Sequence, residues 1–375
     1  MVNDASPSRD ADLSPYADRL ARAQAEMTRQ GVDLLLIGIS PDLRYLIGYA
    51  GHASERLSLL VLPRRGDPAY VVPTLEAPGL AGRRDLLDLH PWEETQIPAD
   101  FVARLAGEMR GKTIAVGDHL RSAFLLRLQA AIGGARWVEA GPTLRPLRMI
   151  KDGREIELMR EVARRTDDAW AQFLSQPLAG QTERQAIARL VDLTSAHDLD
   201  PGFGICASGP HSASPHHEAG HRVIGLGDAV VFDWGGTLEG YFSDVTRTVS
   251  VGEPSAEFRR AYGVVLAANE AALEAVRPGV ACEEIDLAAR GVIEAAGYGA
   301  AFIHRVGHGL GLDIHEEPYL VTGNDLPLAA GMVFSDEPGI YLEGRFGIRI
   351  EDAVLCTDEG GERLNEATRE LTVVG

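Results

Sequence analysis

Two carboxylates, Asp233 and Asp244, lie on either side of a glycine-rich stretch in the second half of the chain. Short apolar or aromatic runs adjoin both of them, and such runs around a glycine-bearing turn predict a β-hairpin. If Leu238 and Glu239 form the turn, Asp233 pairs with Asp244 and their side chains share a face, about 5 Å apart at Cβ. Two like charges at that distance require a cation between them or a proton on one of them. The alternative is that one aspartate caps the turn and the other faces water.

Three more residues of metal-binding type follow in separate segments: His308, Glu337 and Glu351. The segment around Glu351, GIRIEDAVL, alternates strictly, so Glu351 and Arg349 share the face opposite the two isoleucines. Together with the two aspartates, these residues make a set of four carboxylates and one imidazole. A set rich in hard oxygen donors suits Mn, Co, Fe or Zn, and carboxylates that bridge suit two ions.

Two other interpretations of the histidine segment are rejected. His304 and His308 are four residues apart, as in the zinc-protease helix motif, but that motif needs a glutamate after the first histidine, and here Arg305 follows. Gly307 and Gly309 also favour a loop over a helix. As a phosphate-binding signal the glycines are weak, because GHGLG matches neither GxGxxG nor a P-loop.

Composition limits the classes of protein that fit. A chain of 375 residues predicts one large domain or two ordinary ones. The net charge of -19 argues against nucleic acid as a partner, because phosphate contacts need clustered Lys and Arg. The three cysteines are far apart and indicate neither a disulfide framework nor a CxxC metal site. With no apolar run of signal-peptide or membrane-spanning type, we expect a cytoplasmic protein without a membrane partner.

Strands alternate with helices in the first part of the chain, which predicts an α/β domain. Apolar runs predict strands over residues 33–39, 43–48, 58–63, 69–72 and 113–117. Helical spacing is found over residues 16–29, 101–110 and 123–132. Pro146 should break the structure near residues 144–152, so we predict two domains, residues 1–148 and 149–375. Long helices are expected in the second domain over residues 155–174, 183–197, 256–275 and 281–296.

The chain resembles the pita-bread metallopeptidases, the creatinase, aminopeptidase P and prolidase family, in five ordered segments: FDWGG, YFSDVTRT, HRVGHGLGLDIHEEP, DEPGIY and GIRIEDAV. The family includes methionine aminopeptidase, Xaa-Pro aminopeptidase and Xaa-Pro dipeptidase (prolidase). The resemblance covers residues 150–375 strongly. The residues before them look like the creatinase-like α/β domain that prolidases and Xaa-Pro aminopeptidases carry and common methionine aminopeptidases lack. The resemblance implies an α/β (α+β) protein with an N-terminal creatinase-like domain and a C-terminal pita-bread catalytic domain.

The resemblance also implies a role for each candidate ligand. Asp233 looks like the chelating ligand of the first metal, and Asp244 and Glu351 look like the carboxylates that bridge both metals. His308 and Glu337 resemble ligands of the second metal. The cofactors implied are two divalent ions, with Mn expected and Co or Zn as alternatives. The ions would activate a water for attack on the peptide carbonyl, and Glu337 resembles the residue that takes its proton.

Four further residues match substrate-binding positions of the family. His216 resembles a histidine that contacts substrate near the scissile bond, and His315 one that helps deliver a proton to the departing proline nitrogen. His304 resembles a proline-pocket histidine, and Arg349 an arginine that binds substrate or supports the ligands. One departure is Asp336, where the family commonly has an apolar or small residue. It either tunes metal affinity or points outward.

The function implied is hydrolysis of the peptide bond before proline, with Xaa-Pro dipeptides as the expected substrate. The alternative is an Xaa-Pro aminopeptidase that releases the first residue of a longer peptide. The metal sites of the two would be the same, so selectivity is expected to depend on what closes the channel, and the loop of residues 50–58 with Arg56 is the candidate. An exposed salt bridge is the alternative role for Arg56. The intact ligand set argues against a binding-only protein and against metal-free creatinase, and the family suggests a homodimer.

Overall fold

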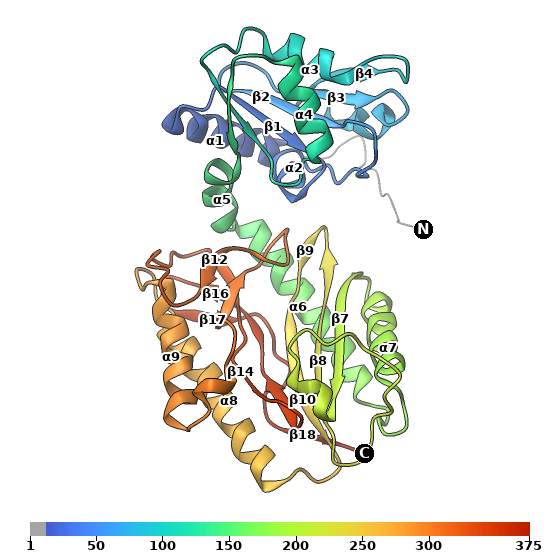
Figure 1. Cartoon of the computed structure of the whole chain (residues 1–375), viewed down its shortest axis with the longest axis vertical. Coiled ribbons are helices and arrows are strands. Elements are labelled where there is room, and N and C mark those ends of the chain that lie inside the picture. The colour runs from blue at the N-terminus through green and yellow to red at the C-terminus, as the bar shows by residue number, and fades with distance from the viewer. Residues whose placement is uncertain (1–12) are drawn as a thin grey trace. The chain divides into compact units, whose positions relative to one another are not determined.

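A computed structural model describes residues 13–375 of the chain. They fold into two compact units that divide between Arg148 and Met149 (Figure 1). The architecture is mixed α/β, as predicted from the sequence. Among the described residues, no helix is both long and apolar enough to cross a membrane.

A six-stranded sheet forms the centre of the first unit, in the order β4-β3-β2-β1-β5-β6. β1 runs antiparallel to β2 and parallel to β5, so the sheet is mixed. Its strands are β1 (Leu34–Gly38), β2 (Leu59–Pro63), β3 (Ala69–Pro73), β4 (Asp88–Trp92), β5 (Thr113–Val116) and β6 (Arg136–Glu139). The helices are α1 (Ser14–Gln30), α2 (Pro41–Ile47), α3 (Pro98–Ala106), α4 (Ser122–Ala131) and α5 (Gly141–Met149), with a 3-10 helix, η1 (Ala77–Arg83).

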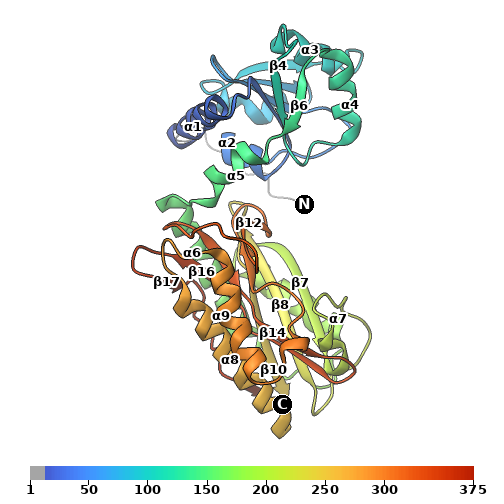
Figure 2. The ribbon, with the colours of Figure 1, turned by 60° about the vertical axis from the view of Figure 1, so that its left-hand side comes forward.

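Alternate residues of the central strands build an apolar layer in this unit. Leu34 and Leu36 of β1 point to the same side, because strand side chains alternate. They belong to one buried cluster with Val102 of α3 and Leu128 of α4. Figure 2 shows α3 and α4 on one side of the sheet and α1 on the other. Full burial of one such leucine contributes about 1.5–3 kcal/mol, so the apolar pattern of these strands strongly favours the sheet.

Two local predictions for this unit are wrong. Residues 43–48 form part of the helix α2 rather than a strand, because Ser40 caps the helix by accepting from the Leu43 N–H and Gly48 ends it with φ +66°. Pro146 lies inside α5 rather than breaking the structure. A proline leaves the carbonyl four residues earlier without its helical donor. Here that carbonyl, of Pro142, accepts from Gln30 Nε2 at 2.7 Å, which offsets the loss.

The second unit contains two larger sheets and a two-stranded one, ordered β18-β10-β8-β7 with β9 on β8, β12-β11-β13-β16-β17, and β14-β15. The first comprises β7 (Asp200–Ser208), β8 (Ala229–Leu238), β9 (Tyr241–Phe242), β10 (Val245–Val251) and β18 (Thr372–Val374). The others comprise β11 (Gly307–Gly309), β12 (Glu316–Leu320), β13 (Val333–Asp336), β14 (Gly339–Leu342), β15 (Phe346–Arg349), β16 (Asp352–Cys356) and β17 (Gly361–Arg363). The helices are α6 (Gly153–Phe173), α7 (Glu183–Ala196), α8 (Ala256–Ala275) and α9 (Cys282–Ala295), with 3-10 helices η2 (Gly209–Ala213) and η3 (Gly299–Ala301).

Each larger sheet of this unit is supported by helices. On the first sheet, Trp170 of α6 stacks on Trp234 of β8 with ring centroids 4.7 Å apart, and Phe173 meets Phe232 at 5.0 Å. On the second sheet, α8 and α9 lie side by side, and their apolar residues join the buried core of the strands (Figures 1 and 2). The helices therefore pack against the two larger sheets. Other residues of these sheets and of their connecting segments are the candidate ligands.

The predicted hairpin is present, but its register differs from the prediction. The turn lies at Glu239 and Gly240, with φ of +48° and +82°, and not at Leu238 and Glu239. Positive φ at both central positions is the two-residue turn that matches strand twist, and glycine tolerates it best. As a result, Asp233 pairs with Thr246 instead of Asp244. The shift is two residues, and because side chains alternate with period two, it leaves Asp244 on the face predicted for it.

Candidate metal centre

The predicted ligands are all in the second unit, on its strands or in the short segments that connect them. Asp233 lies on β8, and Asp244 lies in the break between β9 and β10. His308 is the middle residue of β11, and Glu337 directly follows β13. Glu351 lies between β15 and β16 and forms an isolated bridge with Thr246 of β10. That bridge joins the two larger sheets at the candidate centre.

His308 lies on a strand and not in the predicted loop. Glycine is required on both sides of it by close backbone approach: a Cβ on Gly307 would meet the Ser335 carbonyl oxygen at 1.9 Å, and one on Gly309 would meet that of Glu317 at 2.3 Å. The glycines therefore mark packing between strands. The rejection of the helical zinc-protease interpretation is confirmed.

The ring of His308 is oriented as a metal ligand requires. Its Nδ1 donates to the Gly309 carbonyl at 3.2 Å, which leaves the lone pair of Nε2 free. Nε2 faces Asp244 Oδ2 at 3.6 Å and Glu337 Oε1 at 3.3 Å. Burial and the nearby His315 lower the pKa of His308 to about 3, so its imidazole is neutral. The neutral nitrogen and the two carboxylates face one another with their lone pairs. Such an arrangement favours binding of a cation.

The carboxylates of the centre are buried close to one another. Ligand atoms of Asp244, His308 and Glu351 lie within 4.8 Å of one another, a spacing at which they could hold an ion. Burial, and then the charges of Glu351 and Asp233, raise the pKa of Asp244 well above its usual range. Burial likewise raises the pKa of Glu337 to about 7, although Arg349 opposes the shift. The side chains thus favour added positive charge, by protons or by metal ions.

Arg349 is the buried cation of this centre, and it is central to a chain of polar contacts. It forms an ion pair with Asp233, and its Nε lies 3.9 Å from Glu351 Oε2. Its Nη1 donates to the Tyr341 hydroxyl at 3.0 Å. That hydroxyl lies 2.9 Å from Nε2 of His304, whose pKa burial lowers to about 4. Because Nδ1 of His304 donates to the Arg305 carbonyl, Nε2 of the neutral ring accepts a hydrogen bond from the Tyr341 hydroxyl.

The other two predicted substrate residues also lie near the centre. The ring of His315 meets that of His308 edge-on, with centroids 4.1 Å apart. His216 is exposed, and its charge acts on both His304 and His315, whose pKa values are lowered first by burial and also by this neighbour. The fold therefore brings all nine predicted site residues into one region, from segments more than 100 residues apart.

Three supporting residues were not predicted from the sequence. Thr246 donates to Glu351 and accepts from Arg349 Nε at 3.0 Å. Ser335 donates to Glu337 at 3.2 Å and accepts from the backbone N–H of His308 at 3.0 Å. Tyr341 is the third. The available signal was position: Thr246 and Tyr341 lie in recognised segments and Ser335 directly precedes one, and Thr246 and Ser335 are each two residues from a candidate ligand.

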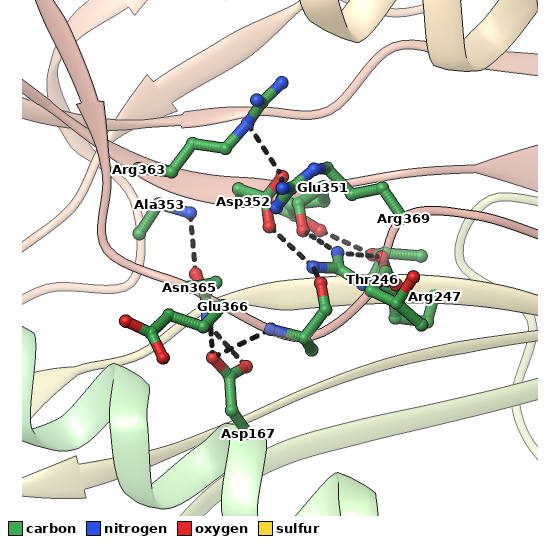
Figure 3. A network of polar contacts seen from close by, with 12 residues as sticks. Asp167, Thr246, Arg247, Glu351, Asp352, Ala353, Arg363, Asn365, Glu366 and Arg369 are labelled. Atoms are coloured by element: carbon green, nitrogen blue, oxygen red, sulfur yellow. Dashed lines mark hydrogen bonds and ion pairs between the residues drawn. The ribbon is translucent and has the colours of Figure 1, made fainter.

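A second cluster of buried charges lies beside the centre, and we call it the arginine cluster: Asp352 with Arg247, Arg363 and Arg369. Figure 3 shows Arg363 and Arg247 reaching Asp352 from different sides. Arg247 lies 2.6 Å from it, Arg363 3.3 Å and Arg369 3.6 Å. Asp336 pairs with Asp352 across β13 and β16 and is 1% exposed, so it does not point outward to solvent. Burial and Asp352 raise its pKa well above its usual range.

The residues present fit a divalent metal. The set combines hard oxygen donors with one neutral imidazole, and Asp233 Oδ1 is buried without a hydrogen-bond partner. A second group that could hold an ion consists of Glu183, His211 and His217. There, each of the two histidines is hydrogen-bonded to the glutamate. In chemical terms, the first group can supply a metal-bound water for hydrolysis, since carboxylate-rich centres of this kind activate water at neutral pH.

The fold and this centre are those of a hydrolytic metalloenzyme, and comparison with known proteins identifies the family. Residues 157–358 match Metallopeptidase family M24. Residues 19–150 match the Creatinase/Prolidase N-terminal domain. The chain belongs to metallopeptidase family M24. The resemblance inferred from its sequence motifs is thereby confirmed, and membership implies divalent metal ions.

Individual relatives extend over nearly the whole chain. A probable dipeptidase, PepE, of Mycobacterium tuberculosis is 42% identical over 372 residues, covering 98% of this chain and 99% of that protein. The crystal structure of dipeptidase PepE from Mycobacterium ulcerans gives a TM-score of 0.92 at 42% identity, covering 97% of this chain and 99% of the other. A prolidase from Thermococcus sibiricus gives 0.92 at 37% identity, covering 96% and 99%. The chain is thus a peptidase related to dipeptidases and prolidases.

Proposed function

We propose that this peptidase hydrolyses the peptide bond before proline, with Xaa-Pro dipeptides as its substrates, at a centre of two divalent ions. The observation that carries the proposal is the convergence of five donors, with the Nε2 lone pair of His308 facing Asp244 and Glu337. Relatives named dipeptidase and prolidase support it. The bond before proline resists general peptidases, because proline lacks an N–H and restricts its neighbour, so a dedicated site is plausible.

The proposed ligand roles follow the order of the residues along the chain. Asp233, Asp244, His308, Glu337 and Glu351 would hold the two ions, with Asp233 toward the first ion, His308 and Glu337 toward the second, and Asp244 and Glu351 shared between them. When bound, the ions supply a water of lowered pKa. Glu337 would take the proton of the attacking water as the general base. Mn is the proposed metal, with Co or Zn as alternatives, because carboxylate-rich sites accept several ions and availability decides between them.

The proposed substrate contacts come from the residues around this centre. His216 is exposed and contacts the peptide near the scissile bond. His315 is half-buried next to His308 and passes a proton to the departing proline nitrogen. His304 and Arg349 line the part of the proposed substrate site that takes the proline residue. The Tyr341 hydroxyl connects these two side chains. Tyr341 therefore belongs to the proposed substrate-binding wall as well.

The alternative substrate class is a longer Xaa-Pro peptide, from which an aminopeptidase would release the first residue. In our proposal, residues 149–375 carry the chemistry and residues 1–148 control access. Arg56 of the loop 50–58 forms ion pairs with Glu94 at 2.6 Å and Glu55 at 2.8 Å and is partly exposed. The Arg56→Ala variant should change the KM for dipeptides or the rate on tripeptides. Unchanged values for both would remove this loop from the proposal.

The proposed setting is a cytoplasmic homodimer that acts on short proline-containing peptides. Cys206, Cys282 and Cys356 are buried and unpaired, as suits a reducing compartment. The dimer is proposed from the family alone. Sedimentation equilibrium of the purified protein would measure the oligomeric state directly.

The test of function is metal reconstitution with paired substrates. The protein is stripped with chelator, reloaded separately with Mn, Co or Zn, and offered an Xaa-Pro dipeptide, an Xaa-Pro-Xaa tripeptide and a dipeptide without proline. Metal-dependent cleavage of the Xaa-Pro dipeptide alone is the expected result. Cleavage mainly of the tripeptide would establish the aminopeptidase alternative. Equal cleavage of the two dipeptides would overturn the requirement for proline. Cleavage of none of the three substrates, with metal demonstrably bound, would overturn the proposed function.

A further inference from the structure

Glu183 is a buried carboxylate outside the candidate metal centre, at the start of α7. Its side chain is 0% exposed. Its Oε1 accepts from the Ser208 backbone N–H at 2.9 Å and from His211 Nδ1 at 3.0 Å. Its Oε2 accepts from His217 Nε2 at 2.9 Å and from the Gly220 N–H at 3.1 Å. One carboxylate thus forms hydrogen bonds with four residues of a single segment, residues 208–220.

The hydrogen bonds to Glu183 keep it ionised in spite of its burial. Burial by itself raises the pKa of a carboxyl, but donors from Ser208 and His217 outweigh that effect and lower the pKa to about 2. Hydrogen bonds to an ionised acceptor are about twice as strong as neutral ones. The charge is therefore satisfied by protein donors, unlike the charges of the metal centre, and no cation is needed to explain the cluster.

The segment held by Glu183 also forms hydrogen bonds with residues of β15. The Ser212 hydroxyl accepts from the Gly347 N–H of β15 at 2.7 Å. The Pro215 carbonyl accepts from Arg349 Nη1 at 3.4 Å. His216 lies between these hydrogen-bonded residues, directly after Pro215 and directly before His217. The backbone on both sides of His216 is consequently held by Glu183 and by β15.

We propose that Glu183 is a positioning residue of this peptidase, which holds residues 208–220 so that His216 is presented to the peptide substrate. The inference rests on the proposed function, in which His216 contacts the substrate. Glu183 acts through His216 and contacts no reacting atom. A displacement of about 1 Å in a positioning group costs up to about 100-fold in rate, so loss of this carboxylate should be measurable in catalysis.

The test is a double-mutant cycle on kcat/KM for an Xaa-Pro dipeptide, with Glu183→Gln, His216→Ala and the double variant. The glutamine keeps the size of the side chain but turns one acceptor into a donor facing N–H groups. Glu183→Gln should lower kcat/KM by up to about 100-fold. The double variant should be no worse than His216→Ala. Losses that multiply would show that Glu183 does not act through His216 and would overturn the proposal.

Glu155→Gln is the matched control, because Glu155 is another buried glutamate in the first turn of a helix. It accepts from the Tyr241 hydroxyl at 2.6 Å and contributes to the capping box of α6, away from residues 208–220. Its substitution removes a comparable charge. Its effect on kcat/KM should multiply with that of His216→Ala, which separates general destabilisation from positioning.

Amide hydrogen exchange tests the same proposal without any activity. In Glu183→Gln, the amides of Ser208 and Gly220 should exchange faster than in the wild type, while in Glu155→Gln they should not. Metal content should stay at the wild-type value. Unchanged exchange at both amides would overturn the role of Glu183 in holding the segment. If the wild type cleaves no Xaa-Pro peptide, the proposed function fails, and exchange still decides whether Glu183 holds residues 208–220.

Discussion

Two groups of buried charges lie next to each other in the second unit, and they are balanced in opposite ways. The candidate metal centre gathers four carboxylates around one guanidinium, that of Arg349. The arginine cluster gathers three guanidiniums around Asp352, with Asp336 beside it. Glu351 and Asp352 are consecutive residues, yet each belongs to a different group, because successive strand residues point to opposite sides.

The difference shows in which group the protein supplies the cations that oppose the carboxylate charge. In the arginine cluster, Arg247 donates to the carbonyls of Thr368, Thr246, Glu351 and Ala367 and to the Asp352 carboxylate. All the donors of Arg247 are used by protein acceptors. Asp352 Oδ2 and both carboxyl oxygens of Asp336 are buried without a hydrogen-bond partner, but the charge of Asp352 is opposed by three arginines of the protein itself. In the metal centre the carboxylates exceed the cations that the chain provides. Residue types alone do not distinguish the two groups; the ratio of charges in space does.

The largest expected effect separates two neighbouring carboxyls, Glu337 and Asp336. Glu337→Gln should lower kcat by about 100- to 10,000-fold, the usual contribution of a general base. Asp336→Asn should leave kcat near the wild-type value, because Asp336 faces Asp352 and its raised pKa favours the neutral acid. Steady-state kinetics with metal analysis of both variants provides the check. Similar losses in both variants would contradict the separation of the two groups.

The next effect tests the contribution of Arg247 to the arginine cluster. Arg247→Met should lower the free energy of unfolding by about 3–5 kcal/mol, because it leaves Asp352 and several carbonyls without a partner. Urea unfolding of the metal-loaded protein measures this. Arg164→Met is the control, since Arg164 pairs with Asp168 on the exposed face of α6 and should matter far less. Equal losses would mean that the cluster contributes no more than a surface pair.

A smaller effect is expected from Ser335, which joins His308 to Glu337. Ser335→Ala should weaken metal binding by about 10- to 100-fold, the usual cost of removing a group that orients a ligand. Competition with a chelator of known affinity measures it. Ser255→Ala, which removes the N-cap of α8, should affect stability and leave metal affinity unchanged. Unchanged affinity in Ser335→Ala would remove Ser335 from the support of the centre.

The smallest effect concerns pH and the chelator-treated protein. Folding raises the pKa of Glu337 from its usual 4.5 to about 7, mainly by burial. A carboxyl with a raised pKa stabilises the fold fully below its unfolded pKa and loses that contribution as pH rises through the folded value. The chelator-treated protein should therefore lose stability between about pH 5 and about pH 8. The metal-loaded protein should lose less, and chelated Glu337→Gln should show a weaker dependence than chelated wild type.

The grouping of the candidate site residues was predicted from the sequence to a large extent. The five candidate ligands and the four candidate substrate residues lie in segments with distinctive residue types, and the strict alternation of GIRIEDAV placed Arg349 and Glu351 opposite the buried isoleucines. The helices of the second unit have strong apolar periodicity and were predicted to within a few residues. These features are local, so a single sequence carries them.

Other features depended on competing local preferences, or on contacts between distant residues, which a single sequence does not display. The hairpin register was missed because the preference of Gly240 for positive φ decides the turn, and residues 43–48 were misread because a cap and a glycine outweighed a short apolar run. Thr246, Ser335 and Tyr341 were missed because a hydroxyl is informative only once its partners are known.

The sequence by itself determined the chemistry available to this protein: a set of hard donors, the strand faces that carry them, and the membership of family M24. Only the tertiary structure decided which charges meet. Asp233 and Arg349 are 116 residues apart, and Lys151 and Glu316 form a buried pair at 2.7 Å across 165 residues. Local rules act over a few residues, whereas the pairing of buried charges depends on how whole sheets pack, and that packing separates Glu351 in the metal centre from Asp352 in the arginine cluster.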